Sequence, residues 1–216
     1  MSSEGKKLHN ALRQRFDGSH KKRLCDIYHS FRKCSEDDSN GRQLVSSEVQ
    51  AINFDKLTKW LSTGNKPQSA DSLTFRDDDI YLIEFKAGNQ VEHDNRIKAL
   101  IENVSGKIND SADTLYNQIF PLVCDLDKRK TRIRFYLVAD SDAMGIDPMM
   151  SILAKLALSE VGLPNPNDQK LFQQVLPNLK SNAKYPERFE DIDIWYSAWF
   201  DRYIENHRIK DIREIV

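Results

Sequence analysis

The sequence predicts an α/β domain in which a small mixed β-sheet is flanked by helices, with helical additions at both ends. Apolar residues recur at helical spacing near the N-terminus and over residues 92–120. Two short apolar runs on either side of residues 76–79 are typical of a β-hairpin. A third run, TRIRFYLVAD at 131–140, has the composition of a strand. Together these elements predict a layered α/β or α+β arrangement.

The bulk composition fits one domain of 216 residues. Hydrophobic residues make up 39% of the chain and charged residues 30%, enough for a core beneath a solvated surface. The formal net charge is -1, so a polyanion would have to be bound by a local patch. The cysteines at 25, 34 and 124 lack metal-ligand spacing and are expected to be reduced thiols.

The polar start of the chain, MSSEGKKLHN, has no apolar signal segment. No apolar run approaches the roughly 20 residues that a membrane span requires. We therefore expect a soluble, cytoplasmic protein with no membrane partner.

Residues 4–34 predict two basic helices. In the first, Leu8, Leu12 and Phe16 share one face; in the second, apolar residues recur from Leu24 to Phe31. Asp17-Gly18-Ser19 predicts the break between them, with Ser19 as an N-cap. A third helix is expected over 46–62, ending at a loop that contains Pro67.

The strands of the hairpin are expected at about 71–75 and 80–86. Ile-Tyr-Leu-Ile at 80–83 is apolar on both faces, which predicts a central strand covered on both sides. Beyond it we expect one long or two shorter helices over 92–120, then the strand at 131–140. The C-terminal part predicts the following elements: a helix at 149–158 with Pro148 before it, a connector at 163–168, a weak helix at 169–180 and a final docking helix at 195–209.

The expected hairpin brings charged side chains together. If its turn centres on Asp77-Asp78, facing residues have numbers that sum to 155, so Asp71 faces Glu84. Facing side chains share one side of the sheet, with Cβ atoms about 4.5–5.5 Å apart. The two-residue period of a strand places Lys86 on that side as well. Two carboxylates and an ammonium group are therefore expected at one end of a buried hairpin.

Two facing carboxylates repel each other, and burial strengthens the repulsion. A divalent cation relieves it, because Mg²⁺ prefers oxygen ligands such as Asp71, Glu84 and the backbone carbonyl of Phe85. A bound water then becomes acidic, and Lys86 could orient or deprotonate it during phosphodiester hydrolysis. The alternative is an ionic cluster, with Glu84 paired to Lys86 and Asp71 solvated at the end of the strand.

KPQSADSLTFRDDDIYLIEFKAG (66–88) resembles the core of the PD-(D/E)XK nuclease superfamily. That pattern has an Asp opening one strand, a short turn, and Glu-x-Lys on an apolar strand, which Asp71, Glu84 and Lys86 match in order. The proline of the pattern should directly precede the Asp, but Ala70 stands there and Pro67 lies upstream. The resemblance covers residues 66–88 closely and the surrounding helix–strand–helix layout loosely.

The resemblance implies a restriction-endonuclease-like fold and a nuclease that uses Mg²⁺ or Mn²⁺. Asp71 and Glu84 would be the metal ligands and Lys86 the catalytic lysine. We expect a single nuclease-like domain over 1–216, divided into a basic helical extension (1–40), a catalytic core (41–160) and a C-terminal helical region (161–216). DNA is favoured over RNA as substrate, and a homodimer or a protein partner is left open.

Relatives in this superfamily suggest further candidates. Glu48 could be an additional metal ligand, because it opens the helix expected before the hairpin; its other interpretation is an ordinary first-turn Glu. Gln118, with Tyr116 nearby, could contact nucleic acid or simply lie on a polar helix face. Lys107 could contact phosphate or be solvated.

Two basic stretches, 6–33 and 127–134, could bind phosphates or be solvated faces. Within the first, Lys21, Lys22 and Arg23 are the candidates for nucleic-acid binding. Two other functions stay open: a catalytically silent nuclease-fold binding module, and an immunity or assembly factor whose acidic region at 187–201 contacts a partner.

Overall fold

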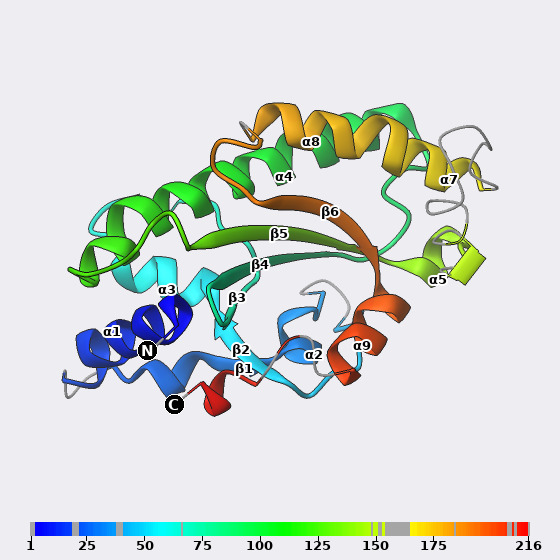
Figure 1. Cartoon of the computed structure of the whole chain (residues 1–216). Coiled ribbons are helices and arrows are strands. Elements are labelled where there is room, and N and C mark those ends of the chain that lie inside the picture. Colours follow the sequence, from blue (N-terminus) through cyan, green and yellow to red (C-terminus); the bar gives the residue numbers. More distant parts are fainter. Residues whose placement is uncertain are drawn as a thin grey trace.

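The structure is a computed structural model that describes residues 3–18, 22–37, 41–65, 67–147, 149–150, 153, 165–183, 185–206, 209 and 211–215. Within these residues, six strands form one mixed β-sheet that helices flank (Figure 1), as the sequence predicts. The strands are β1 (Tyr28–Ser30), β2 (Gln50–Asn53), β3 (Ser72–Arg76), β4 (Asp79–Lys86), β5 (Arg132–Ala139) and β6 (Asp191–Tyr196).

The sheet order follows the chain, from β1 to β6. The pairs β1–β2, β2–β3 and β3–β4 are antiparallel, whereas β4–β5 and β5–β6 are parallel. A parallel neighbour requires the chain to cross back over the sheet, which here is done by helices. Consequently, the segment after β4 must lie against the face of the sheet.

The helices before β4 are α1 (Glu4–Asp17), η1 (Leu24–Ile27), α2 (Phe31–Cys34) and α3 (Phe54–Leu61). The crossover from β4 to β5 consists of α4 (Asp94–Thr114), the π-helix η2 (Leu115–Ile119) and η3 (Phe120–Leu122). Between β5 and β6 lie α5 (Ser141–Met144), α7 (Pro166–Gln169), the π-helix η4 (Lys170–Val175) and α8 (Leu176–Asn182). The chain ends with α9 (Ser197–Glu205) and η5 (Ile212–Glu214).

Strand β4 is covered on both faces, which confirms the predicted central strand. Every residue from Asp79 to Phe85 is buried. Ile80 and Leu82 belong to a core shared with residues of α1, α4 and α8. Tyr81 and Ile83 belong to a second core, with residues of α2 and α9. Figure 1 shows α4 and α8 on one side of the sheet and α2 and α9 on the other.

Two predicted helices near the N-terminus are wrong in part. α1 ends at Asp17 with Gly18 as its C-cap, as expected, but the second helix is replaced by η1, β1 and α2. Ser19 lies outside the described residues. The helix expected over 46–62 begins only at Phe54, after the N-cap Asn53, because Gln50–Asn53 forms β2. Tyr28–Ser30 and Gln50–Ile52 pair with each other. This long-range pairing overrides the local helical spacing.

The sequence also failed to predict β6, so the region 161–216 is not helical throughout. Ile192, Ile194 and Tyr196 are buried while Asp191 and Asp193 are half-buried, the alternation of a strand. The final helix therefore starts at Ser197, and α7 already begins at Pro166. The helix expected at 149–158, with Pro148, lies largely outside the described residues. Strands β1 and β6 extend the sheet beyond 41–160 at both ends.

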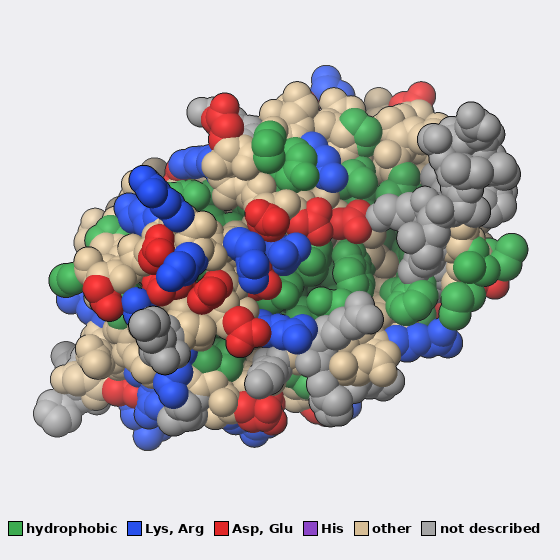
Figure 2. Space-filling model, in the orientation of Figure 1, with side chains coloured by type: hydrophobic (Ala, Val, Ile, Leu, Met, Phe, Trp, Pro, Cys, Tyr) green, Lys and Arg blue, Asp and Glu red, His purple; other side chains and the backbone are tan. Residues whose placement is uncertain are grey.

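Acidic and basic side chains are intermixed on the face in Figure 2, in keeping with the net charge of -1. In the described part of the chain, no helix combines the length and apolar character that crossing a membrane would require.

The turn of the hairpin is held by the start of α1. The Gly5 N–H donates to the Asp77 carbonyl at 2.9 Å, and the Glu4 N–H donates to Asp78 Oδ1 at 2.9 Å. A Cβ at Gly5 would lie 2.6 Å from that same Asp77 oxygen. A methyl group therefore does not fit unless α1 moves away from the hairpin.

We expect Gly5→Ala to lower the free energy of unfolding by about 1–3 kcal/mol, a typical overpacking cost, although Ala is the better helix former. Gly64→Ala is the matched control, because nothing lies within 4 Å of its added Cβ. Urea denaturation measures both. A Gly5→Ala protein as stable as the control would show that this contact does not hold the hairpin.

Candidate active site

The hairpin register places the candidate residues. The pairs Phe75–Ile80 and Leu73–Leu82 form as predicted, with numbers that sum to 155. Pairing ends at Ser72–Ile83, one pair short of Asp71 and Glu84. The predicted pair of Asp71 with Glu84 is therefore not formed in the ladder. Asp71 lies just before β3, and its N–H donates to the Ile83 carbonyl at 3.0 Å.

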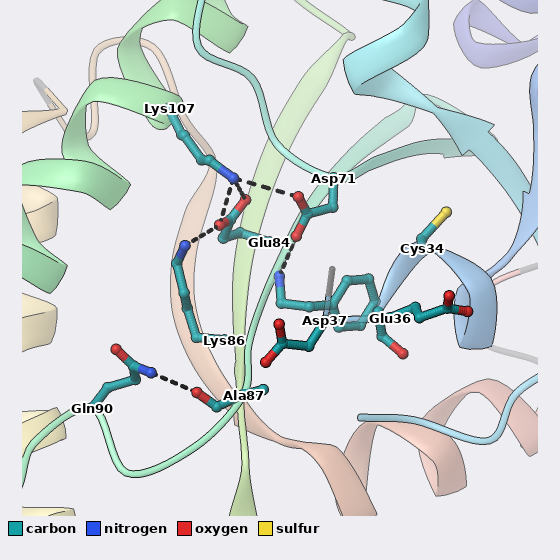
Figure 3. Close-up of a pocket in the computed structure, with 11 residues that line it drawn as sticks. Cys34, Glu36, Asp37, Asp71, Glu84, Lys86, Ala87, Gln90 and Lys107 are labelled. Carbon is teal, nitrogen blue, oxygen red and sulfur yellow. Dashed lines mark hydrogen bonds and ion pairs between the residues drawn. The ribbon is translucent and has the colours of Figure 1, made fainter. Parts of the chain in front are cut away.

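The Asp71 side chain replaces the missing ladder contact. Its Oδ2 accepts the Phe85 N–H at 2.8 Å, so a backbone donor of β4 is satisfied by a carboxylate. This hydrogen bond fixes Asp71 beside β4 and leaves Oδ1 directed toward α4 (Figure 3). Asp71 and Glu84 thus still converge, although by a different local geometry from the predicted one.

Glu84 is fully buried at the end of β4. Its Oε1 accepts from Lys86 Nζ at 2.8 Å and from Lys107 Nζ at 2.7 Å, and its Oε2 accepts from Lys107 at 2.8 Å. Lys86 contacts Glu84 directly, as the two-residue period of a strand predicts. A buried carboxylate with two ammonium partners avoids the large cost of an unpaired buried charge.

Lys107 comes from α4 and joins the two carboxylates. Its Nζ also lies 3.4 Å from Asp71 Oδ1, so that it sits between Asp71 and Glu84 (Figure 3). The sequence alone did not predict this position. The available signal was its place in α4 next to the apolar Val104 and Ile108, since a lysine close to a core requires a partner. Part of the ionic-cluster alternative is therefore realised, with Lys107 in addition to Lys86.

The cluster changes the acidity of its members. Two effects raise the pKa of Asp71 to about 7. The larger is burial, and the second is the negative charge of the nearby Glu84 carboxylate. Burial alone would lower the pKa of Lys107, but the carboxylates of Glu84 and Asp71 outweigh it and the pKa of Lys107 is raised. Lys107 therefore carries its positive charge at neutral pH.

These groups face a cavity of about 400 Å³ at the ends of β3 and β4. Its lining residues are Cys34, Ser35, Glu36, Asp37, Asp71, Glu84, Phe85, Lys86, Ala87, Gln90 and Lys107. A second cavity of about 430 Å³ adjoins it and shares Lys86 and Gln90. Lys86, whose side chain is 24% exposed, therefore lines both cavities.

The donor set fits a divalent cation in chemical type, because two carboxylates converge as hard oxygen donors. The Lys107 ammonium lies between these donors, however, and already pairs with both. Among the described residues, no group of three or more His, Cys, Asp or Glu side chains is arranged to hold a metal. Any ion at Asp71 and Glu84 would have to compete with Lys107.

The other predicted site residues lie elsewhere. Glu48 opens no helix; its side chain is 63% exposed and pairs with Arg32 at 2.7 Å, so it is not brought to the cavity. The predicted helix start was wrong because residues 50–53 form β2. Gln118 and Tyr116 lie in η2 and do not line the cavity.

Lys22 and Arg23 also lie away from the cavity lining. Lys22 Nζ lies 5.5 Å from the centroid of the Trp60 ring, and Arg23 pairs with Asp26 at 3.0 Å. Lys21 lies outside the described residues. Nucleic-acid binding by these side chains stays a prediction.

No protein-family model, curated protein or solved structure matches this chain.

We expect the contribution of Asp71 to the free energy of unfolding to fall as the pH rises from about 4 to about 7. In the unfolded chain an Asp ionises near 3.8, but the raised pKa keeps Asp71 protonated in the folded protein up to about 7. The folded state binds more protons in this interval, so this contribution is fully present below about pH 4 and is lost above about pH 7. Asp71→Asn removes it.

Urea denaturation from pH 4 to pH 8 tests this. The stability of the wild type relative to Asp71→Asn should fall with pH by an amount on the order of a few kcal/mol. Glu102→Gln, an exposed position on α4, controls for general charge effects. A wild type–Asp71→Asn difference that stays constant with pH would contradict the raised pKa.

Proposed function

We propose that this chain is a metal-dependent nuclease that hydrolyses phosphodiester bonds in nucleic acid, with DNA favoured over RNA. The observation that carries the proposal is the convergence of Asp71, Glu84 and Lys86 on one cavity at the end of a buried hairpin. A fully buried Glu84 beside a second carboxylate is costly for a fold to maintain, and perturbed ionisable groups gather at functional sites.

The resemblance to PD-(D/E)XK nucleases adds to this proposal. Asp71 immediately before β3, the turn at 77–78, and Glu84-Phe85-Lys86 on β4 follow the order of that pattern. A mixed sheet flanked by helices, with α4 crossing from β4 to β5, is compatible with the restriction-endonuclease-like core that we propose. Membership of that superfamily is part of the proposal.

The charge of the cavity supports a role for a cation. Among its lining residues, the four carboxylates of Glu36, Asp37, Asp71 and Glu84 outnumber the two ammonium groups. Phosphate would be repelled from such a cavity unless additional positive charge entered with it. We assign the ion, Mg²⁺ or Mn²⁺, to Asp71, Glu84 and the Phe85 carbonyl. When bound, it would stabilise charge on the phosphate and make a bound water more acidic.

We assign Lys86 the role of the catalytic lysine. It is partly exposed to the cavity while its ammonium is held by Glu84 at 2.8 Å. From there it can orient the attacking water and offset negative charge on the phosphate. Glu84 fixes the lysine, and the Phe85 N–H fixes Asp71, so that the three groups are positioned before a substrate arrives.

A second function is favoured by one specific observation. Lys107 satisfies both carboxylates without a metal, which would suit a nuclease fold used only as a binding module for nucleic acid or protein. The acidic region at 187–201 could then contact a protein partner. A metal titration separates this function from the first.

We expect Mg²⁺ or Mn²⁺ to raise the melting temperature of the wild type, because the ion binds only the folded state. At about one hundred times the Kd the gain is about 2.7 kcal/mol. Asp71→Asn should lose the shift and the cleavage of plasmid DNA. Lys86→Ala should keep the metal-induced shift in melting temperature but cleave at least about 100-fold more slowly, because it loses the ammonium group that orients the attacking water.

Lys98→Ala, exposed on α4, should melt and cleave as the wild type does. EDTA should abolish the shift and the cleavage. A wild type without a metal-induced shift, or an Asp71→Asn protein with full metal-dependent cleavage, would refute the nuclease proposal.

We also expect the triple substitution of Lys21, Lys22 and Arg23 by Gln to weaken DNA binding and flatten its salt dependence. Each lost phosphate contact removes about 0.9 from the slope of log affinity against log salt. Binding is measured in EDTA, so that the DNA stays intact, with Lys98→Gln as the control. If the slope does not change, these side chains belong to a solvated face.

A further inference from the structure

Lys107 occupies the space in which a bridging cation would be expected. Its Nζ lies 2.7 and 2.8 Å from the two oxygens of Glu84 and 3.4 Å from Asp71 Oδ1. Figure 3 shows the ammonium directed between the two carboxylates. Lys86, in contrast, forms an ion pair with Glu84 and with no other carboxylate among the described residues. Lys107 is thus the group that joins the carboxylates to each other.

The charges of the cluster are balanced in this arrangement. When both carboxyls are ionised, two negative and two positive formal charges cancel around the fully buried Glu84. A divalent cation added between Asp71 and Glu84, beside both ammonium groups, would leave an excess of positive charge within this cluster, next to the fully buried Glu84. Like charges at such short range repel strongly where water does not screen them. One ammonium must therefore leave for the ion to enter.

Lys107 is better suited than Lys86 to leave. It blocks both carboxylates, so removing it opens the most oxygen donors. Its ammonium is carried on a flexible four-carbon stem. Lys107 lines the cavity and its side chain is 20% exposed, so rotation about the side-chain bonds can carry the ammonium away from the carboxylates without a change in the backbone of α4.

We propose that Lys107 is a built-in counter-ion that competes with the divalent cation for Asp71 and Glu84. This inference rests on the proposed metal-dependent function and adds its regulation. In the metal-free protein Lys107 pairs with the buried Glu84 and the partly exposed Asp71 and stabilises the fold. When the ion binds, the ammonium is released toward the cavity, where an anionic substrate can use it. The metal affinity of the wild type is lowered by this competition.

Substitution of Lys107 tests the competition by metal binding, without an activity assay. The loss of the free Mn²⁺ signal in electron paramagnetic resonance gives the Kd for the wild type, Lys107→Met and Lys107→Gln. Lys98→Met is the matched control, a lysine on the same helix that is 79% exposed. Lys107→Gln is a second, polar variant in case Lys107→Met does not fold, and circular dichroism checks all four proteins.

We expect both Lys107 variants to bind Mn²⁺ at least tenfold more tightly than the wild type, and Lys98→Met to bind as the wild type does. Without metal, the Lys107 variants should melt at a lower temperature, and Mn²⁺ should raise it by more than in the wild type. Equal Kd values for the wild type and a folded Lys107 variant would overturn the competition while leaving the nuclease proposal intact. If no protein binds Mn²⁺, the metal-dependent function fails, and this inference fails with it.

Discussion

Glu84 places a carboxylate within the sheet with no exposed surface, and two ammonium groups hold it there. A buried charge without partners would cost several kcal/mol, more than a typical domain can lose without large effects on folding. The requirement for compensation ties three separate parts of the chain together: the end of β4, the residue before β3, and the middle of α4. The positions of β4 and α4 relative to each other therefore also decide whether the charge of Glu84 is compensated.

The sheet topology is what makes this compensation available. Strand β5 is parallel to β4, so the chain must cross the sheet between them, and α4 is the long helix of that crossover. Apolar residues of α4 pack on the same face of β4 as Leu82, the face on which Glu84 also lies. Lys107 is thereby brought above Glu84. The antiparallel β3–β4 hairpin supplies Asp71 from the residue before β3, and the Phe85 N–H holds its side chain beside β4.

The same contacts have opposite consequences for stability and for chemistry. Lys107 stabilises the carboxylates of the metal-free protein, but a cation that served phosphate chemistry would need the same oxygens. Asp71 is in a similar position. Burial raises its pKa and so disfavours its ionised form, whereas a bound divalent cation would favour that form. Sites that combine burial with crowded charge often show this exchange of stability for function.

The sequence by itself determined the hairpin and the placement of Glu84 and Lys86 on one face, because turn composition and a two-residue period are local properties. It also determined α1, α4 and β5, whose apolar patterns are long and regular. Only the tertiary structure decided that residues 28–30 and 50–53 are strands, since their pairing joins segments about twenty residues apart and overrides helical spacing. The tertiary structure also placed Glu48 away from the site and Lys107 within it. Which ammonium group neutralises the buried Glu84 depends on which one the folded chain brings into contact with it.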